Sequence, residues 1–378
     1  MLSLSKHEHG ISEPAAGLPA APAAADSTAV VESWMAEALA PTPLPAGTSS
    51  RELVRRAIAF DRPARLPYGL LMPVRSDFFE IAALRRVVGA EPCAEGGEGY
   101  CDEWGVRRRA TSYSWDPVVS HPLADLERLD SYRFPDAASL VNAESVAPFV
   151  RRARDAGKYV VAADPVSMYE RLESLLGFES LLTAPRREAG AFAALLDHLA
   201  DLTVEAIGMV SRLPGVDAFM TWQDLAAQTG PHVSLDTFRR FFKPSYARIA
   251  AAAHEKNLHF IWHICGAVAD LIPELIDLGV DVLQLDQPRL VGHEVLATRF
   301  GGKVCFWNTI DTQWAVAGPR SPADLHAEAS AMIRPFADLP GGLMLRHYPF
   351  PDDIRLTPEF HEDTARAFAE IAGLRAAV

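Results

Sequence analysis

The sequence predicts an α/β fold, and within that class a (β/α)8 TIM barrel. Short apolar segments rich in β-branched and aromatic residues alternate with longer segments of helical periodicity, which indicates a parallel sheet covered by helices. The predicted strands number about seven or eight over roughly 320 residues, close to what such a barrel requires. An open doubly wound sheet is the alternative, but the sequence contains neither GxGxxG nor GxxxxGK[ST].

The individual elements follow from apolar spacing. Apolar residues three and four positions apart predict helices at residues 51–60, 190–210, 235–256, 267–278 and 321–336. Compact apolar runs closed by polar or turn residues predict strands at residues 66–72, 159–163, 218–222, 258–265, 280–285, 303–307 and 342–346.

The chain is predicted to fold as one domain behind an N-terminal tail. Residues 1–47 are dominated by Ala and Pro and hold few aromatics, a composition that buries too little apolar surface to offset the entropy of ordering it. We expect this tail to be disordered and residues 48–378 to form the barrel. A stretch rich in Gly, Pro and charge at residues 89–138 indicates an insertion or lid after the first strand.

The composition argues against a nucleic-acid-binding, membrane-spanning or secreted protein. The net charge of −13 and the lack of a basic run argue against a nucleic-acid partner. No apolar run reaches the ~18 residues of a membrane span, and the N-terminus lacks the apolar core of a secretory signal. Four widely spaced cysteines without a CxxC motif indicate free thiols in a reducing compartment, so we expect a cytoplasmic protein.

Polar residues stand at the ends of six consecutive predicted strands. In a barrel these ends meet at one rim, where the βα loops carry the chemistry. For the aspartates 164, 224 and 311, capping of the following helix is an equally simple explanation. The residues concerned are Asp164, Gln223 with Asp224, His263 with Cys265, Asp286 with Gln287, Asn308 to Asp311, and His347 with Tyr348.

His263 and Cys265 are the most informative pair at this predicted rim. Two residues apart on a strand, they project from the same face. An imidazole and a thiolate on one face provide two ligands of a zinc site. The structural alternative is a histidine paired with a neighbouring carboxylate beside a packed thiol.

Several segments, taken in order, resemble the uroporphyrinogen decarboxylase (URO-D) superfamily. They span residues 51 to about 360, nearly the whole chain after the predicted tail, and the superfamily fold is a (β/α)8 barrel. The matching segments are residues 57–63 (AIAFDRP), 102–105 (DEWG), 222–230 (WQDLAAQTG), 238–244 (FRRFFKP), 263–266 (HICG), 306–311 (FWNTID) and 341–342 (GG).

Within this superfamily the chain resembles the methyltransferases more than the true decarboxylases. The decarboxylases carry a Met-Arg-Gln-Ala-Gly-Arg signature whose arginines hold the carboxylates of the tetrapyrrole. The corresponding residues 67–73 (PYGLLMP) contain no arginine, and only Arg75 follows nearby. The His-x-Cys-Gly element is instead similar to zinc-dependent methyltransferases, which move a methyl group between a corrinoid protein and a thiol or related acceptor.

The resemblance implies roles for particular residues. It implies zinc held by His263 and Cys265, with a corrinoid carrier protein as partner and a small molecule as methyl donor or acceptor. Relatives supply a further cysteine near the last strand, where His347 is the nearest equivalent here, and Cys305 is the other candidate. Candidate catalytic residues are Asp224, Asp164 and Tyr348, and candidate substrate-binding residues are Trp222, Gln223, Asp286, Asn308 and Asp311.

Two other functions remain open from the sequence. One is a cofactor-free decarboxylase of the uroporphyrinogen type, in which Asp164 or Asp224 stabilises a protonated intermediate. The other is a barrel that binds a tetrapyrrole or a partner without catalysis.

Overall fold

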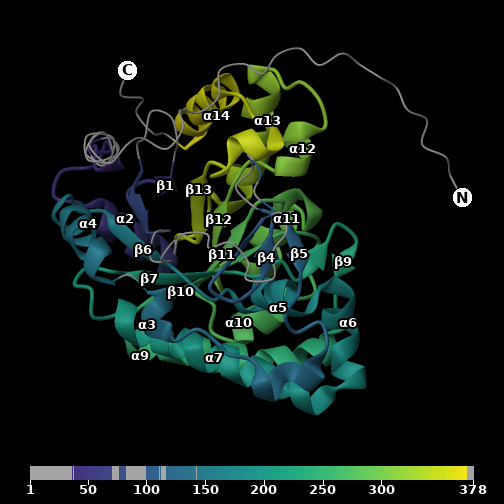
Figure 1. Ribbon diagram of the computed structural model, residues 1–378. Helices are drawn as coiled ribbons and strands as arrows, with labels where there is room; N and C mark the ends of the chain where they lie inside the picture. The colour runs from purple at the N-terminus through teal and green to yellow at the C-terminus, as the bar shows by residue number, and fades with distance from the viewer. Residues whose placement is uncertain are drawn as a thin grey trace, which may run out of the picture.

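An eight-stranded sheet forms the centre of the protein (Figure 1). The computed structural model describes residues 36, 38–69, 76–81, 99–109, 111, 116–141 and 143–372. The strands lie in the order β1-β13-β12-β11-β10-β7-β6-β2, and neighbouring strands in this order are parallel. They comprise β1 (Tyr68–Gly69), β2 (Phe78–Ile81), β6 (Tyr159–Ala163), β7 (Ala218–Trp222), β10 (His259–Ile264), β11 (Val282–Leu285), β12 (Cys305–Asn308) and β13 (Leu343–Arg346).

The two outer strands of this sheet meet and nearly close it. Gly69 and Ser76 form an antiparallel bridge, and the Asp77 N–H donates to the Tyr68 carbonyl oxygen at 2.9 Å. The predicted (β/α)8 barrel is therefore confirmed. All seven predicted strands coincide with observed strands to within a few residues, whereas β2 was not predicted. Its four residues, FFEI, include a glutamate and are too few to show a pattern.

Side chains alternate strictly between the barrel interior and the helix layer. The interior is filled by one apolar cluster that includes Tyr159, Ile261, Cys305, Trp307 and Met344. The intervening strand residues pack outward against the helices. Because successive side chains on a strand point to opposite faces, this alternation decides which polar groups at the strand ends face the interior.

Helices cover the outside of the barrel. In Figure 1, α13 and α14 lie side by side near the C-terminal end, and α7 and α9 pack together on the opposite side. The helices include α2 (Ser50–Ile58), α4 (Ala143–Asp155), α5 (Met168–Leu176), α6 (Phe178–Arg187), α7 (Ala189–Val210), α9 (Lys243–Glu255), α10 (Ile272–Asp277), α13 (Pro322–Ile333) and α14 (Pro358–Ile371). The helix predicted at 267–278 begins only at Ile272. The helix predicted at 235–256 contains a π-helical turn, η3 (Phe238–Phe242).

A small antiparallel sheet lies within the predicted insertion. It consists of β3 (Tyr100–Cys101), β4 (Arg107–Arg108) and β5 (Val118–Ser120). Cys101 is disulfide-bonded, so the expectation of free thiols is wrong for this residue. Spacing along the chain does not show which thiols the fold brings together. Cys265 and Cys305 are free, and the cytoplasmic location stays a prediction.

Part of the predicted tail packs against the barrel. Residues 1–35 and 37 lie outside the described residues. Thr42 is buried, and its hydroxyl donates to Asp77 Oδ1 at 2.9 Å. Arg65 binds the same carboxylate and also the carbonyl oxygen of Pro43. The described chain therefore contacts the barrel before residue 47, while the division into tail, domain and insertion stays a prediction.

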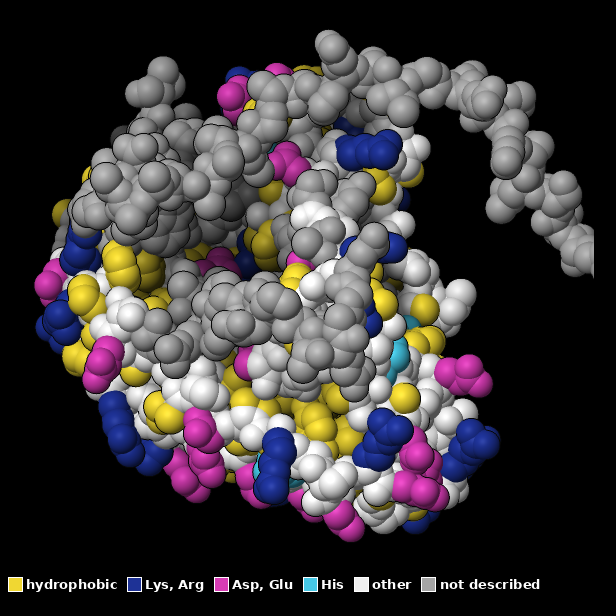
Figure 2. All heavy atoms as spheres, viewed as in Figure 1, with side chains coloured by type: hydrophobic (Ala, Val, Ile, Leu, Met, Phe, Trp, Pro, Cys, Tyr) yellow, Lys and Arg dark blue, Asp and Glu magenta, His cyan; other side chains and the backbone are white. Residues whose placement is uncertain are grey.

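The surface carries charges of both signs. Figure 2 shows acidic and basic side chains interspersed over the lower part of the face that it draws. Within the ranges given above, no helix is both long and apolar enough to cross a membrane.

Candidate metal centre and adjoining cavity

Asp224, His263 and Cys265 come together at the C-terminal ends of β7 and β10. The two strands are adjacent, with Trp222 paired to His263. His263 Nε2 lies 3.6 Å from Cys265 Sγ and 3.6 Å from Asp224 Oδ1. All three ligand atoms lie within 4.8 Å of one another. A nitrogen, a sulfur and an oxygen donor thus surround one point at the rim of the barrel.

The backbone around this group is fixed by its neighbours. The Asp224 N–H donates to Glu170 Oε1 at 2.6 Å, and the Cys265 N–H donates to Asp224 Oδ1 at 3.1 Å. Gly266 turns the chain with φ +92°. A Cβ atom there would lie 2.5 Å from the carbonyl oxygen of Ala226, so only glycine fits after Cys265.

Two further polar residues inside the barrel orient His263. Its Nδ1–H donates to Gln284 Oε1, and Gln284 Nε2 donates to Asp286 Oδ1 at 2.7 Å. Gln284 and Asp286 are both buried. Because Gln284 takes the Nδ1 proton, the lone pair of Nε2 is left facing Cys265 and Asp224. This is the tautomer that a metal ligand requires.

The donor set fits zinc. From ordinary Zn–N, Zn–S and Zn–O bond lengths, ligand atoms of a tetrahedral site lie roughly 3.3–3.8 Å apart, and the two 3.6 Å separations match this. Three protein ligands leave one position for a small molecule, as in catalytic zinc sites. Burial, with the nearby carboxylates of Asp224 and Asp286, raises the pKa of the Cys265 thiol. A thiolate there therefore needs a cation beside it.

The two residues predicted as a third ligand lie outside this group. His347 follows β13 on the face that points to the helices, and its ring centroid lies 4.8 Å from that of His361 on α14. Burial, with His361 nearby, lowers the pKa of His347 well below its ordinary value. Cys305 is buried at the start of β12, within the apolar cluster of the barrel interior. Asp224, predicted as a catalytic residue, takes the third place instead.

Some of the predicted substrate-binding residues face the barrel interior and others face the surrounding helices. Asp286 faces the interior, and Trp222 packs against the interior cluster. Gln223 points to the helices, where Oε1 accepts from the Tyr169 N–H at 2.7 Å and from the Tyr246 hydroxyl. These bonds join β7 to its covering helices, a structural contact rather than one with the rim.

Asn308 and Asp311 also occupy positions away from the group. The Asn308 amide is buried, and neither of its polar atoms has a hydrogen-bond partner within the described ranges. Asp311 caps α12 (Thr312–Val316), where its carboxylate accepts from the Trp314 N–H at 2.9 Å and the Arg289 N–H at 3.0 Å. Asp311 thus caps a helix, which was the alternative explanation that the sequence offered for this residue.

The other two predicted catalytic residues follow β6 and β13. Asp164 accepts from the Thr221 hydroxyl at 2.7 Å and from the Val166 N–H at 2.8 Å, and burial raises the pKa of its carboxyl. Tyr348 is half-buried, and burial, with Asp286 nearby, raises the pKa of its phenol. At neutral pH the Tyr348 hydroxyl is therefore a hydrogen-bond donor.

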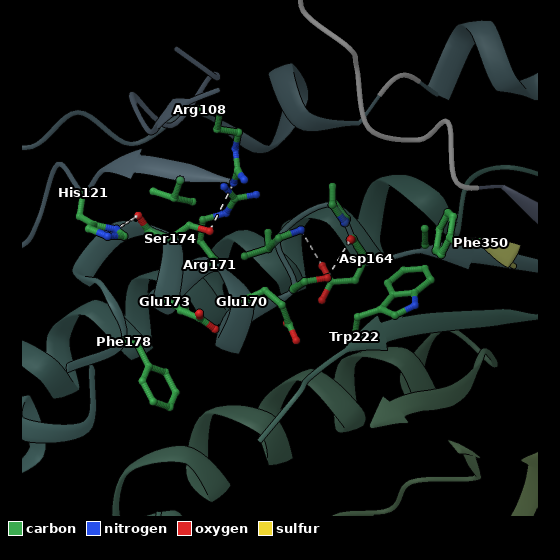
Figure 3. Close-up of a pocket in the computed structure, with 15 residues that line it drawn as sticks. Arg108, His121, Asp164, Glu170, Arg171, Glu173, Ser174, Phe178, Trp222 and Phe350 are labelled. Atoms are coloured by element: carbon green, nitrogen blue, oxygen red, sulfur yellow. Dashed lines mark hydrogen bonds between the residues drawn. The ribbon is translucent and has the colours of Figure 1, made fainter. Parts of the chain in front are cut away.

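A cavity of about 570 Å³ is lined by residues of α5 and of the end of β6 (Figure 3), and one of them, Glu170, accepts from the Asp224 N–H. The Glu170 and Glu173 side chains extend into it from α5, and Glu170 holds the Asp224 backbone. Neither residue was predicted from the sequence, because no helix was predicted directly after Asp164. The lining consists of Arg108, Val118, His121, Ala163, Asp164, Pro165, Val166, Ser167, Glu170, Arg171, Glu173, Ser174, Phe178, Trp222 and Phe350.

Arg346 was also missed. The sequence analysis looked for arginines beside the first strand, whereas Arg346 ends the last one. Its guanidinium lies 4.4 Å from the Trp307 ring centroid and pairs with Glu80 Oε2 at 2.7 Å. A cation therefore does reach the barrel interior, from β13, where Arg346 is the register partner of Gly69 on β1.

Comparison with known proteins supports the fold and shows the family. The profile of the family "Uroporphyrinogen decarboxylase (URO-D)" matches residues 105–345, more than half of the 378 residues. The uroporphyrinogen decarboxylase of Geobacillus kaustophilus (strain HTA426) is 29% identical over 186 residues, which cover 45% of this chain and 49% of that protein. That of Geobacillus sp. (strain WCH70) is 28% identical over 191 residues, with the same coverage. The chain thus spans about half the length of the curated relatives it matches.

A solved structure shows the same architecture over most of the chain. A methyltransferase from Methanosarcina mazei superimposes with a TM-score of 0.58 at 17% identity, covering 85% of this chain and 98% of that chain. At this identity the likeness shows the fold alone. The barrel, the matched range and the curated relatives agree, and the chain belongs to the uroporphyrinogen decarboxylase family.

Proposed function

We propose that the protein is a zinc-assisted methyltransferase or demethylase that moves a methyl group between a corrinoid carrier protein and a small molecule. The observation that carries this proposal is the group of three donors at the rim, Asp224, His263 and Cys265. It is supported by the oriented imidazole of His263 and by the cavity beside Asp224.

Each residue has a defined task in this proposal. Asp224 Oδ1, His263 Nε2 and Cys265 Sγ hold the zinc, and Gln284 keeps the Nδ1 proton away from the metal side of the ring. Zinc, when bound, lowers the pKa of a coordinated thiol so that a thiolate persists near neutral pH. A thiolate is the species able to attack a methyl group.

The small molecule and the corrinoid approach from different sides. The cavity between α5, the small sheet and Trp222 offers about 570 Å³ for the small molecule, and Glu170 in its lining accepts from the Asp224 N–H. We assign the corrinoid to a separate carrier protein because the described residues are taken up by the barrel, its helices and the small sheet. The carrier would dock on the barrel rim formed by the C-terminal ends of the strands, where β7 and β10 carry the three donors.

Metal analysis of the purified full chain tests the proposal. We expect about one equivalent of zinc, and less than about a tenth of an equivalent in Cys265→Ala and His263→Ala. Cys305→Ala is the matched control, because Cys305 is the other free cysteine and lies outside the donor group, so it should retain zinc. Equal zinc content in all three variants, or none in the wild type, would contradict the zinc site.

Demethylation of methylcobalamin in the presence of small thiols measures the reaction itself. Loss of the Co–CH3 absorbance should require zinc and Cys265. Wild-type protein that holds zinc yet leaves methylcobalamin unchanged with every thiol would contradict the methyltransferase assignment.

A cofactor-free decarboxylase is the second candidate. It is favoured by the curated relatives and by Arg346 in the barrel interior, which could hold a substrate carboxylate. Release of CO2 from uroporphyrinogen by metal-free protein would support it. If the protein binds porphyrinogen but neither demethylates methylcobalamin nor releases CO2 from uroporphyrinogen, it is a barrel that binds its ligand without catalysis.

A further inference from the structure

The cavity beside Asp224 has an acidic side. Glu170 and Glu173 lie one turn apart on α5, and both side chains extend into the cavity (Figure 3). Glu170 Oε1 accepts from the Asp224 N–H, whereas Glu170 Oε2 is buried and has no hydrogen-bond partner in the described part of the chain. Within the same ranges, neither glutamate forms an ion pair with a lysine or arginine. A ligand that brings a hydrogen-bond donor would satisfy this oxygen.

Both arginines of the cavity contact one carboxylate, that of Asp102. Arg108 Nε lies 3.0 Å from Asp102 Oδ2, and Arg108 Nη1 donates to the Asp116 carbonyl oxygen at 3.1 Å. The Arg171 guanidinium lies 4.2 Å from the Trp104 ring centroid, with Nη1 3.7 Å from the same Asp102 carboxylate. Glu170 and Glu173 form no ion pair with either arginine, and the basic side chain near Glu173 is His121. A cationic ligand is therefore favoured over an anionic one at that end of the cavity.

We propose that this cavity binds the ammonium group of an amine-bearing thiol, with the nitrogen between Glu170 and Glu173. The sulfur then lies at the group formed by Asp224, His263 and Cys265, which adjoins Glu170 through its bond to the Asp224 backbone. This inference rests on the proposed function and adds the substrate class. An ammonium group donates three hydrogen bonds, which suits two carboxylates one helical turn apart.

Three thiols with the same two-carbon spacer test the proposal. Cysteamine carries an ammonium group, 2-mercaptoethanol a hydroxyl and 3-mercaptopropionate a carboxylate. Calorimetric titration of each into the zinc-loaded full chain gives the three dissociation constants. We expect cysteamine to bind at least about tenfold more tightly than either of the others.

Variants separate the role of the glutamates from the properties of the thiols themselves. The three thiols differ in thiol pKa, so their relative affinities for free zinc are measured first as a reference. In the double variant Glu170→Gln, Glu173→Gln, the preference for cysteamine should fall to within about twofold of that reference. Glu173→Gln alone, which keeps the Glu170 bond to Asp224, should lose part of the preference. Glu179→Gln, on the exposed side of α6, is the matched control and should retain it.

Each contrary result has a different meaning. Equal binding of the three thiols, or a cysteamine preference unchanged in the double variant, would overturn the ammonium site and leave the zinc site standing. Tightest binding of 3-mercaptopropionate would assign the cavity to an anion instead. Failure of every thiol to bind a chain that retains zinc would refute the inference, whereas a wild-type chain without zinc would refute the proposed function itself.

Discussion

Gln284 lies directly across from His263 in the parallel pairing of β10 and β11, and its side-chain oxygen accepts the His263 Nδ1 proton. Gln284 is held in turn by Asp286, two residues further along the chain and directly after β11. His263, Gln284 and Asp286 form a polar row inside the barrel. Gln284 and Asp286 lie on the Nδ1 side of the His263 ring, away from its candidate ligand atom Nε2. Their alignment depends on strand register, because a shift by one residue would turn Gln284 toward the helices.

Removing the Gln284 contact should weaken zinc binding without removing a ligand. For Gln284→Leu we expect about a 10- to 100-fold loss of zinc affinity, as for other residues that orient a ligating histidine. Competition with a chromophoric chelator measures the affinity. Gln228→Leu is the control, because Gln228 contacts Gln287 and not His263. Equal affinities in both variants would contradict the orienting role of Gln284.

Two variants should distinguish Asp224 from His347 as the third ligand. Asp224→Asn removes a charged oxygen donor, so zinc affinity should fall by at least about tenfold. His347→Gln should leave the affinity unchanged, because His347 faces His361 and the helix layer. The same chelator competition measures both, and loss of zinc in His347→Gln with retention in Asp224→Asn would reverse the assignment.

Gly266→Ala should destabilise the protein through the backbone. Its φ of +92° disfavours any L side chain, and the new Cβ would lie 2.5 Å from the Ala226 carbonyl oxygen. We expect the free energy of unfolding to fall by at least about 2 kcal/mol. Gly302→Ala is the control: φ is +76° there but no atom lies within 4 Å, so about 1 kcal/mol is expected. Urea unfolding compares the two, and equal losses would show that the contact with Ala226 adds nothing.

The buried histidines should make stability fall in weak acid. Burial, with His361 nearby, holds the pKa of His347 well below 6.5, and burial also lowers the pKa of His361. Below about pH 6.5 the unfolded chain therefore binds more protons than the folded chain, so the free energy of unfolding should decrease from pH 7 to pH 5. His347→Gln should reduce this slope by up to about 1.4 kcal/mol per pH unit. Urea unfolding at each pH measures it, and an unchanged slope would contradict the assignment to His347.

Local sequence pattern was enough for most of the barrel and for the core of the site. Apolar runs such as Tyr159–Ala163 and Ala218–Trp222 are buried on both faces, so they show as continuous apolar segments. The spacing of His263 and Cys265 places them on one face without knowledge of any other strand. Strand β2 was missed because four residues carry too little pattern.

The remaining site residues depended on contacts between segments far apart in the chain. Asp224 and His347 both follow strands, but the sequence predicted His347 as the third ligand and Asp224 as a catalytic residue. Pairing of β7 with β10 brings Asp224 to His263, while alternation along β13 turns His347 to α14. Glu170 and Glu173 reach the site only because α5 packs over the end of β7, which no local pattern predicts.

The sequence by itself determined the fold class, the family and the pairing of His263 with Cys265, because strand periodicity and short motifs are local properties of the chain. Only the tertiary structure decided the third donor, the orienting role of Gln284 and the acidic cavity on α5. These depend on strand register and helix packing, which bring together side chains that are distant in sequence.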